Sequence, residues 1–211
     1  MNYQFPDSLL IIMAKVPIAG RAKTRLIPAL GAAKAARLHA NLVEFTLNKH
    51  RHARVCPVQL CCSPDPRHVF FQSQKQPGIQ LTTQSKGDLG LRMYFAMQQA
   101  LSNARSIVLI GTDCPDLQPK QITQGLQFLE SGHNAVLGPA DDGGYYLIGL
   151  NHASLALFTN IAWGKPTVLK QTRQKLQALN WKWEELESLR DIDRPADLNS
   201  GKYQRAIWRK I

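Results

Sequence analysis

The chain has 211 residues and a formal net charge of +11, with 44% hydrophobic and 19% charged residues. This composition excludes a disordered or fibrous protein, and the length favours one globular domain over residues 1–211. The longest apolar run near the start, residues 9–14, is far shorter than the roughly 20 residues that cross a bilayer and lacks a signal-peptide pattern, so we expect a cytoplasmic protein.

Apolar runs of strand length alternate with longer helical patterns along the chain. The expected strands are residues 9–14, 57–62, 79–82, 106–110, 135–138 and 145–150. The expected helices are residues 32–49, 89–101, 120–129 and 166–179. This alternation is typical of βαβ units and predicts an α/β fold with a mainly parallel sheet.

Three polar, glycine-bearing loops follow expected strands: residues 15–28, 112–119 and 140–144. Ligands of open α/β sheets bind in the crevice at the carboxyl ends of the strands. These loops are therefore where a functional site is expected.

The first loop is basic and follows the first expected strand directly. Its Gly20 would let backbone N–H groups approach an oxyanion, and Arg21, Lys23 and Arg25 can neutralise a di- or triphosphate. The spacing is not that of a Walker P-loop. The position after the first strand favours phosphate binding over the alternative of a solvated basic turn.

The second loop places two carboxylates, Asp113 and Asp116, three residues apart after a buried-type strand. Hard oxygen ligands at a strand end suit Mg²⁺ or Mn²⁺ that bridges substrate phosphates. We favour Asp113 as the ligand, whereas Asp116 is equally well explained as the cap of the helix that follows.

The third loop pairs Asp141 and Asp142 with Gly143 and Gly144, a composition typical of a tight hairpin turn. A turn at this sheet edge could also present an acid that binds sugar hydroxyls or serves as a catalytic base. Both interpretations can hold together.

Residues 190–198 resemble a strand end followed by a helical turn that starts at Pro195. Asp193 would either cap that turn, with Asp197 in its first turn, or return to the metal from the side opposite Asp113.

The remaining candidates also have plain structural explanations. Asp88, after Gly87, would cap a helix or form a turn against a nucleobase or ribose. Trp163 would be a packing residue or flank an acceptor. The cysteines show no CxxC pair and are expected to be core thiols; they are Cys56, Cys61, Cys62 and Cys114.

The positive charge favours anionic partners, including nucleic acid. No RNA-binding aromatic signature or zinc-finger spacing accompanies it. The acidic loops would repel a phosphate backbone unless a metal intervened, so nucleic-acid binding ranks last. The basic tail after residue 198 is expected to form a short helix and carries Lys202, Arg205, Arg209 and Lys210.

Taken in order, the segments AKVPIAGRAKTRL, GDLG, GTDCPDL, GPADDGGYYLIGL and DIDRPADL resemble a bacterial family once catalogued as a domain of unknown function and now labelled glycosyltransferase. Some of its members are assigned to arsenosugar biosynthesis. The family is similar to the nucleotide-diphospho-sugar transferase superfamily. The resemblance implies a Rossmann-like GT-A fold: an α/β/α sandwich with a mainly parallel mixed sheet.

The resemblance further implies that the basic loop meets the phosphates, that Asp113 and Asp193 lie at the metal, and that residues 87–90 touch the nucleoside. The chain departs from the family pattern at Leu91, Asp141, Arg194 and residues 164–165, where an acidic residue, Glu, Thr and a Ser-Thr pair are usual.

The leading hypothesis is metal-dependent glycosyl transfer from a nucleoside-diphosphate sugar to a small acceptor. The rival is nucleotidyl transfer, like that of guanylyltransferases, which joins an NTP to a phosphorylated acceptor and releases pyrophosphate. A third possibility is a nucleotide-binding or nucleic-acid-binding protein without turnover.

The hypothesis assigns residues to four roles. Catalysis is assigned to Asp113 and Asp142. The metal ligands would be Asp113, Asp116 and Asp193. Nucleotide and phosphate contacts would come from Ala14, Lys15, Gly20, Arg21, Lys23, Thr24, Arg25, Gly87, Asp88 and Thr112. The remaining substrate would contact Asp141, Gly143, Gly144, Tyr145 and Trp163.

Overall fold

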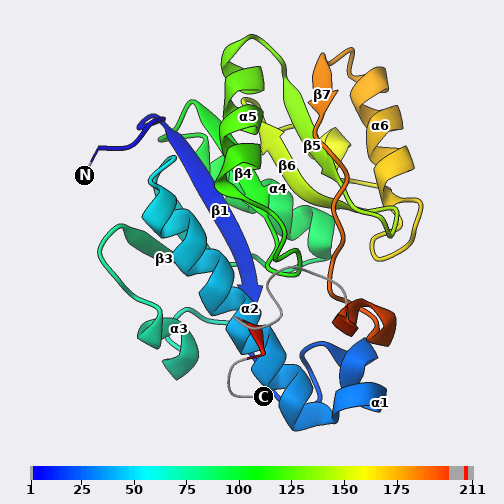
Figure 1. The fold of residues 1–211 in the computed structure, drawn as a ribbon. Helices are drawn as coiled ribbons and strands as arrows, with labels where there is room; N and C mark the ends of the chain where they lie inside the picture. Colours follow the sequence, from blue (N-terminus) through cyan, green and yellow to red (C-terminus); the bar gives the residue numbers. More distant parts are fainter. Residues whose placement is uncertain (1, 200–206, 209–211) are drawn as a thin grey trace.

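A seven-stranded sheet forms the centre of the computed structural model, which describes residues 2–199, 207 and 208 (Figure 1). The strands are β1 (Ser8–Lys15), β2 (Val58–Ser63), β3 (Ile79–Thr83), β4 (Ser106–Ile110), β5 (Ala135–Pro139), β6 (Tyr145–Leu150) and β7 (Trp183–Glu185). Their order is β3-β2-β1-β4-β6-β5-β7, and β6 pairs antiparallel with both neighbours while the other pairs are parallel.

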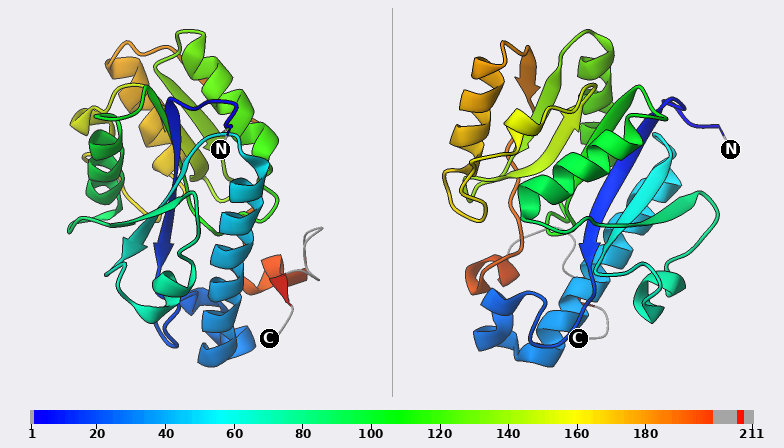
Figure 2. Two further views of the ribbon diagram at one scale, coloured as in Figure 1. Left: turned by 90° about the vertical axis from the view of Figure 1, so that its left-hand side faces the viewer. Right: turned by 180° about the vertical axis from the view of Figure 1, so that it is seen from behind.

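Helices cover both faces of this sheet (Figure 2). The longer helices are α2 (Ala32–Ala53), α4 (Leu89–Ala100), α5 (Pro119–Glu130) and α6 (Val168–Ala178). Side chains of α2 and α5 pack in the core on one face, and those of α4 and α6 pack on the other. Short helical segments complete the fold: α1 (Ile27–Leu30), α3 (Val69–Ser73), η1 (Thr24–Leu26), η2 (Leu155–Leu157) and η3 (Pro195–Asn199).

The two cores follow from the alternation of side chains along buried strands. In β1, Leu10 and Ile12 belong to the core under α2 and α5, whereas Ile11 belongs to the core under α4 and α6. Successive residues of a strand point to opposite faces, so a strand covered on both sides is apolar throughout. This explains why β1 and β4 appear in the sequence as continuous apolar runs.

The expected α/β class, mainly parallel mixed sheet and helices on both faces are confirmed. The six expected strands and four expected helices are all present, with ends within four residues of those expected. The sequence analysis missed β7, which has only three residues, and the short α1 and α3. The expected basic helix of the tail lies mostly outside the described residues, as do Lys202, Arg205, Arg209 and Lys210.

The chain reverses direction across the sheet between β1 and β4. From β1 it runs outward through β2 to β3, and it then returns to β4 on the other side of β1. Two parallel strands whose connections leave in opposite directions open a crevice at their carboxyl ends, the usual ligand position in such folds. The loops after β1 and β4 are the two charged loops in which a site is expected.

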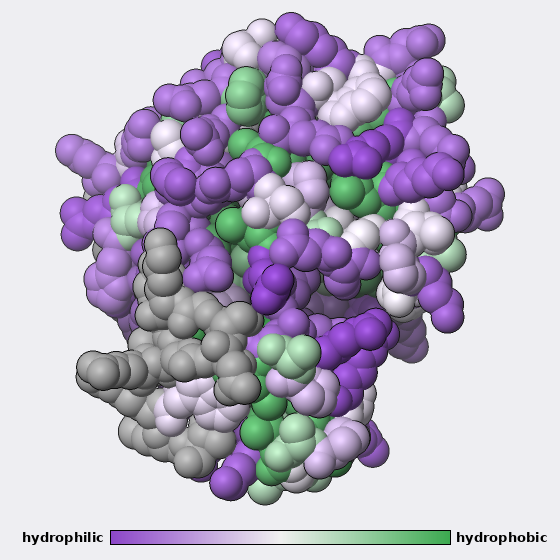
Figure 3. All heavy atoms as spheres, turned by 45° about the vertical axis from the view of Figure 1, so that its right-hand side comes forward, coloured by the Kyte–Doolittle hydropathy of each residue, from purple (hydrophilic) through white to green (hydrophobic). Residues whose placement is uncertain are grey.

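The surface view in Figure 3 shows mostly hydrophilic side chains, with hydrophobic residues in small separate areas. No helix among residues 2–199, 207 and 208 combines the length and apolar character needed to span a membrane.

Candidate active site

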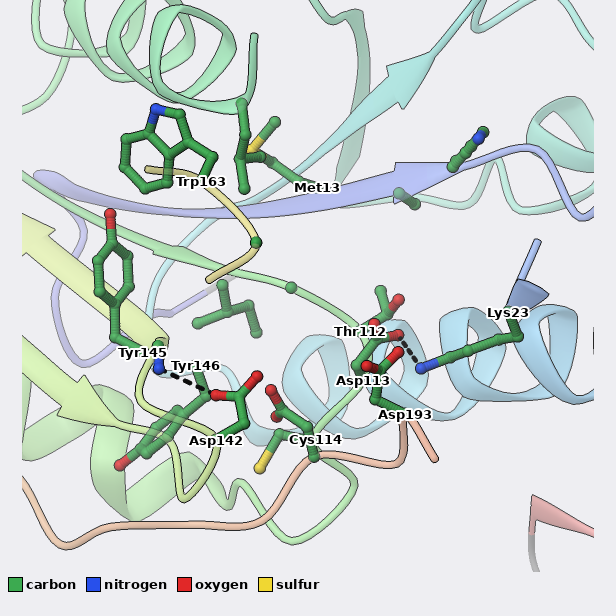
Figure 4. A pocket seen from close by; sticks show the side chains of 18 of the residues that line it. Met13, Lys23, Thr112, Asp113, Cys114, Asp142, Tyr145, Tyr146, Trp163 and Asp193 are labelled. Carbon is green, nitrogen blue, oxygen red and sulfur yellow. Dashed lines mark hydrogen bonds and ion pairs between the residues drawn. The ribbon is translucent and has the colours of Figure 1, made fainter. Parts of the chain in front are cut away.

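A cavity of about 610 Å³ opens at the carboxyl ends of β1 and β4. One side, here called the charged end, contains Arg21, Lys23, Arg25, Asp113, Asp191 and Asp193. The other side, called the apolar end, contains Met13, Met93, Leu109, Tyr145, Trp163 and Val168. Figure 4 shows Trp163 and Tyr145 on one side of the cavity and Lys23 and Asp113 on the other.

The loop after β1 folds back on itself and so brings Lys23 into the cavity. The carbonyl of Ile18 accepts hydrogen bonds from the backbone N–H groups of Arg21 and Ala22, which closes a compact turn. Lys23 has a φ of 49°, a left-handed conformation that is uncommon outside glycine. The buried Leu26 anchors the end of the loop in a third apolar cluster.

Lys23 and Asp113 form an ion pair at the centre of the charged end. Lys23 Nζ lies 2.9 Å from Asp113 Oδ1; the Lys23 side chain is 3% exposed and that of Asp113 is 44% exposed. The ammonium also donates a hydrogen bond to the carbonyl of Ile192. Burial acts to raise the pKa of Asp113, but the charge of Lys23 and hydrogen bonds from Lys23 and Thr112 outweigh it, so the pKa is lowered.

The segment around Ile192 brings two further carboxylates to this end. The backbone N–H of Ile192 donates to the carbonyl of Asp113 at 2.8 Å, and its side chain is buried in the third apolar cluster. Asp191 and Asp193 flank it, and both line the cavity. Asp193 pairs with Arg25.

Asp191 differs from Asp113 in the direction of its pKa shift. Burial and the nearby charges of Asp113 and Asp142 raise the pKa of its carboxyl to about 7, and Lys23 offsets part of this effect. Burial and the neighbouring acids therefore both favour the protonated form of Asp191.

The hairpin turn between β5 and β6 holds Asp142 between Tyr145 and Asp113 (Figure 4). Asp142 Oδ1 accepts a hydrogen bond from the N–H of Gly144 at 2.9 Å, which fixes the direction of the carboxylate. Gly143 has a φ of 87°, and a Cβ there would lie 2.1 Å from the carbonyl oxygen of Pro166. Only glycine fits this close to the carbonyl of Pro166. The turn can therefore pack directly on the segment that leads from Trp163 into α6.

The apolar end is lined by side chains from several elements. The rings of Tyr145 and Trp163 meet edge to face with centroids 6.4 Å apart. Tyr145 lies against Met93, and burial raises the pKa of its hydroxyl. Gly90 leaves room for the indole, since a Cβ there would lie 2.6 Å from Trp163 Nε1.

The structure brings most of the expected site residues into this one cavity. Those that line it are Ala14, Lys15, Arg21, Lys23, Thr24, Arg25, Thr112, Asp113, Asp142, Gly144, Tyr145, Trp163 and Asp193. Lys23 and Arg25, for which phosphate contacts are predicted, pair with the carboxylates of Asp113 and Asp193, because the segment around Ile192 lies directly across from the basic loop.

Six other expected residues do not line the cavity: Gly20, Gly87, Asp88, Asp116, Asp141 and Gly143. Asp141 accepts a hydrogen bond from Ser188 Oγ at 2.6 Å and so faces the segment beyond β7. Asp88 caps α4 through the N–H of Leu91. Asp116 neither reaches the cavity nor caps α5, whose N-cap is Gln118.

A further correction concerns the turn after residue 193. Asp197, rather than Asp193, accepts the hydrogen bonds from the backbone N–H groups of Asp193 and Arg194 that cap it. The Asp193 carboxylate is thereby left to Arg25. The four cysteines are buried free thiols, as expected.

Sequence reasoning missed several residues that line the cavity: Asp191, His39, Gln84 and Lys165. His39 is buried and its Nε2 lies 2.9 Å from the carbonyl of Lys15, so it supports the first loop. For Asp191 a signal existed. In an extended segment, residues two apart share a face, so Asp191 should accompany Asp193.

The acids fit a divalent cation that takes part of its coordination from a substrate. Mg²⁺ binds one or two protein carboxylates and fills its remaining positions with phosphate oxygens and water. Asp113 and Asp193 offer such carboxylates on the same cavity wall. The described residues contain no group of three or more His, Cys, Asp or Glu that could enclose a metal alone, so phosphate oxygens would have to complete the site.

Solved structures share this fold. A crystal structure from Desulfovibrio desulfuricans G20, provisionally named a nucleotide-diphospho-sugar transferase, is 29% identical with a TM-score of 0.85; the match covers 97% of this chain and 95% of that one. The 4-diphosphocytidyl-2C-methyl-D-erythritol synthase of Anaerococcus prevotii DSM 20548 is 11% identical with a TM-score of 0.59, covering 91% and 92%. The manganese complex of Rv0371c from Mycobacterium tuberculosis H37Rv is 15% identical with a TM-score of 0.52, covering 97% and 99%.

The family of the chain follows from a match in sequence. No curated protein matches the chain. A family model described as "Uncharacterized protein conserved in bacteria (DUF2064)" matches residues 46–165. This segment includes the loop of Asp113, the turn of Asp142 and Trp163. Because the match spans more than half of the 211 residues, the protein belongs to this family.

Proposed function

We propose that the protein is a metal-dependent transferase that uses a nucleotide-activated donor, and that it moves a sugar from a nucleoside-diphosphate sugar to a small acceptor. The observation that carries this proposal is the meeting of Asp113 with the basic loop at the point where the sheet reverses direction. An acid for a cation and a set of basic side chains for phosphates lie there together at the charged end of one cavity.

In the proposed reaction, the acceptor oxygen forms a bond to the anomeric carbon while the bond from that carbon to the diphosphate oxygen breaks. Asp142, held by the N–H of Gly144, takes the proton of the acceptor hydroxyl. Arg21, Lys23 and Arg25 stabilise the charge that develops on the departing nucleoside diphosphate. A cation held by Asp113 and Asp193 would add Lewis-acid stabilisation of the same charge.

The comparisons support the proposal in its coarser form. The Desulfovibrio desulfuricans relative carries the name of a nucleotide-diphospho-sugar transferase and matches over nearly the whole of both chains. The manganese complex among the structural matches favours a divalent cation, Mg²⁺ or Mn²⁺. We further propose that residues 1–211 form a single domain of this superfamily. The four free cysteines fit the cytoplasmic location expected from the sequence.

Nucleotidyl transfer is the second candidate. It is favoured by the four basic residues of the first loop, Lys15, Arg21, Lys23 and Arg25, which suit a triphosphate, and by a cytidylyltransferase from Leptospira borgpetersenii among the solved structures that share the fold. In that reaction a phosphate oxygen of the acceptor attacks the α-phosphorus of the NTP and pyrophosphate leaves. Simple nucleic-acid binding is disfavoured by the four cavity carboxylates: Asp113, Asp142, Asp191 and Asp193.

A thermal-shift screen of UDP-, GDP-, ADP- and TDP-sugars and of NTPs, each with and without Mn²⁺, tests the proposal. A ligand present at 100 times its dissociation constant stabilises the protein by about 2.7 kcal/mol, a readily measured change. We expect a nucleoside-diphosphate sugar with Mn²⁺ to give the largest shift.

Product analysis then separates the two reactions. Incubation of the selected donor with candidate acceptors, arsenosugar precursors among them, should release a nucleoside diphosphate. Release of pyrophosphate from an NTP and a phosphorylated acceptor would establish nucleotidyl transfer instead. Salt-sensitive retention of oligonucleotides, without any metal-dependent nucleotide binding, would refute both.

A further inference from the structure

The charged end is already neutralised by the protein itself. Lys23 contacts Asp113 and Arg25 contacts Asp193, so two cationic and two anionic side chains at this end neutralise one another. The ammonium of Lys15 donates to the backbone carbonyl of Arg21 at 3.1 Å. The residues proposed to bind phosphates are therefore paired with the residues proposed to bind the cation.

Lys23 occupies the position beside Oδ1 that a cation could take at Asp113. Its ammonium is 2.9 Å from Asp113 Oδ1, with its side chain 3% exposed and a second bond to the carbonyl of Ile192. A Mg²⁺ ion binds carboxylate oxygens at about 2.0–2.1 Å, inside the space that this ammonium fills. A cation that reaches Asp113 on this side must therefore displace Lys23.

Displacement of Lys23 has a cost unless the ammonium finds another anion. Leaving a buried charge without a partner is strongly unfavourable. The phosphates of a nucleotide bound along the same loop would supply that partner, because Arg21, Lys23 and Arg25 all line the same cavity. The two ion pairs can thus be replaced by pairs of the basic side chains with phosphates and of the carboxylates with the cation. No buried charge is then left without a partner.

We propose that Lys23 is the internal cation of Asp113 in the free protein, and that nucleotide phosphates and a divalent cation bind by a joint exchange of partners with the Lys23–Asp113 and Arg25–Asp193 pairs. This inference rests on the proposed function, since it concerns the same nucleotide and cation. It makes Lys23 a residue that couples two ligands, in addition to a phosphate contact.

Arg21 is placed to start the exchange. Its side chain is exposed and lines the cavity, and the described part of the chain offers its guanidinium no ion-pair partner. It can therefore receive a phosphate before either ion pair opens. The coupling is reciprocal: whatever factor the nucleotide adds to cation affinity, the cation adds to nucleotide affinity.

Cation binding alone gives the first test. Electron paramagnetic resonance of free Mn²⁺ measures its binding to the wild type and to Lys23→Met, without nucleotide. The wild type should bind Mn²⁺ weakly, and Lys23→Met should bind it about tenfold more tightly, within the usual range of coupling between ligands. Lys34→Met, at an exposed residue of α2 outside the cavity, removes the same charge and should bind Mn²⁺ like the wild type.

Lys23→Gln is a second variant for the case that Lys23→Met does not fold. Its amide can still donate a hydrogen bond to the carbonyl of Ile192. It should likewise gain Mn²⁺ affinity, and circular dichroism would show that both variants are folded.

The reciprocal arm uses Asp113→Asn, which frees Lys23 without adding a cation. Metal-free UDP, CDP, GDP and ADP are titrated into the wild type and the variant, with the quenching of tryptophan fluorescence as the signal, since Trp163 lines the cavity. The variant should bind the preferred diphosphate about tenfold more tightly than the wild type does without metal, and it should lose the gain that Mn²⁺ gives the wild type.

The results separate the inference from the proposed function. Equal Mn²⁺ affinity in the wild type and both Lys23 variants, or wild-type binding in which Mn²⁺ and the diphosphate do not influence each other, would overturn the exchange and leave transferase activity standing. A wild type that binds neither nucleotide nor Mn²⁺, alone or together, would overturn the proposed function as well.

Discussion

The two ends of the cavity differ in the kind of side chain that lines them. At the charged end, Lys23 and Arg25 reach across to Asp113 and Asp193, and the protein satisfies its own charges. At the apolar end, Tyr145 and Trp163 form a surface that offers ring area and few polar groups. A ligand must therefore exchange ionic partners at one end, whereas at the other it gains affinity mainly by burying apolar surface. The first end should control turnover and the second the choice of acceptor.

The largest effect on turnover is expected for Asp113→Asn at the charged end. Because the carboxylate would hold the cation that stabilises the leaving group, we expect turnover to fall by about 10³-fold or more. Asparagine is preferable to alanine, since removal of the whole side chain leaves the buried Lys23 ammonium with the carbonyl of Ile192 but no side-chain acceptor at position 113, which costs roughly 1–3 kcal/mol of stability. Steady-state kinetics with the selected donor measures the effect.

The matched control is Asp116→Asn. This residue belongs to the same loop and loses the same charge, but it lies outside the cavity, so turnover should stay within about twofold of wild type. Equal losses in both variants would mean that the loop, and not the carboxylate of Asp113, matters.

The next largest effect is expected at Gly143, in the hairpin turn that holds Asp142. A Cβ there would lie 2.1 Å from the carbonyl oxygen of Pro166 at a φ of 87°. Gly143→Ala should therefore lower the free energy of unfolding by about 2–4 kcal/mol, from backbone strain plus the clash. Urea denaturation provides the measurement.

Gly20→Ala separates the two causes. Gly20 has a similar φ of 80°, but a Cβ there would meet no atom within 4 Å. Only the backbone strain of about 1–2 kcal/mol should appear. If Gly143→Ala were no worse than Gly20→Ala, the hairpin turn would not be fixed by its contact with Pro166, and Asp142 would be less rigidly placed than the comparison assumes.

The charged end could largely be located from the sequence. Asp113 and the basic loop each follow an apolar run, and parallel strands bring their carboxyl ends to one edge of the sheet. The pairing of Lys23 with Asp113 could not be foreseen. It depends on Ile192, which is 169 residues away from Lys23 in the chain and closes the site through a tertiary contact. Local patterns carry no information about such a contact.

The sequence pattern predicted very little of the apolar end. Met13, Met93 and Val168 come from a strand and two helices, and each has the character of an ordinary core residue. Only the packing decides which apolar side chains line a cavity and which fill the core. β7 was missed for a related reason. Its three residues, Trp183–Glu185, are too few to show a period, and it is held by pairing with β5.

His50 lies outside both ends of the cavity but makes the stability of the fold depend on pH. This effect must be known before a pH dependence of activity is assigned to either end. His50 is 3% exposed in α2, and burial followed by the charge of Lys49 lowers its pKa to about 3. In the unfolded chain His50 therefore becomes protonated near pH 6.5, whereas in the folded protein it stays neutral down to about pH 3. The contribution of His50 to stability is complete above pH 6.5 and is lost as the pH falls towards 3.

Between pH 7 and pH 4.5, the wild type should lose about 2 kcal/mol more than His50→Leu does, since each pH unit in that window is worth up to about 1.4 kcal/mol. Urea denaturation at the two pH values tests this. Parallel losses in the two proteins would show that His50 binds its proton equally well in the folded and the unfolded chain, and acid effects on activity could then be assigned to the charged end without correction.

The smallest effect is expected at the apolar end, from Trp163→Leu. The substitution keeps an apolar side chain but removes the ring that meets Tyr145. An aromatic contact is worth about 0.5–1.5 kcal/mol beyond its buried area, so the KM for the acceptor should rise about three- to tenfold. The KM for the donor and kcat at saturating acceptor should hardly change, since the phosphates and the cation are proposed to bind at the other end.

Phe95→Leu, at an exposed aromatic residue of α4 outside the cavity, should leave all three constants unchanged. A rise in the donor KM instead of the acceptor KM would place the nucleoside on Trp163, and the division of the cavity between turnover and acceptor choice would have to be reversed.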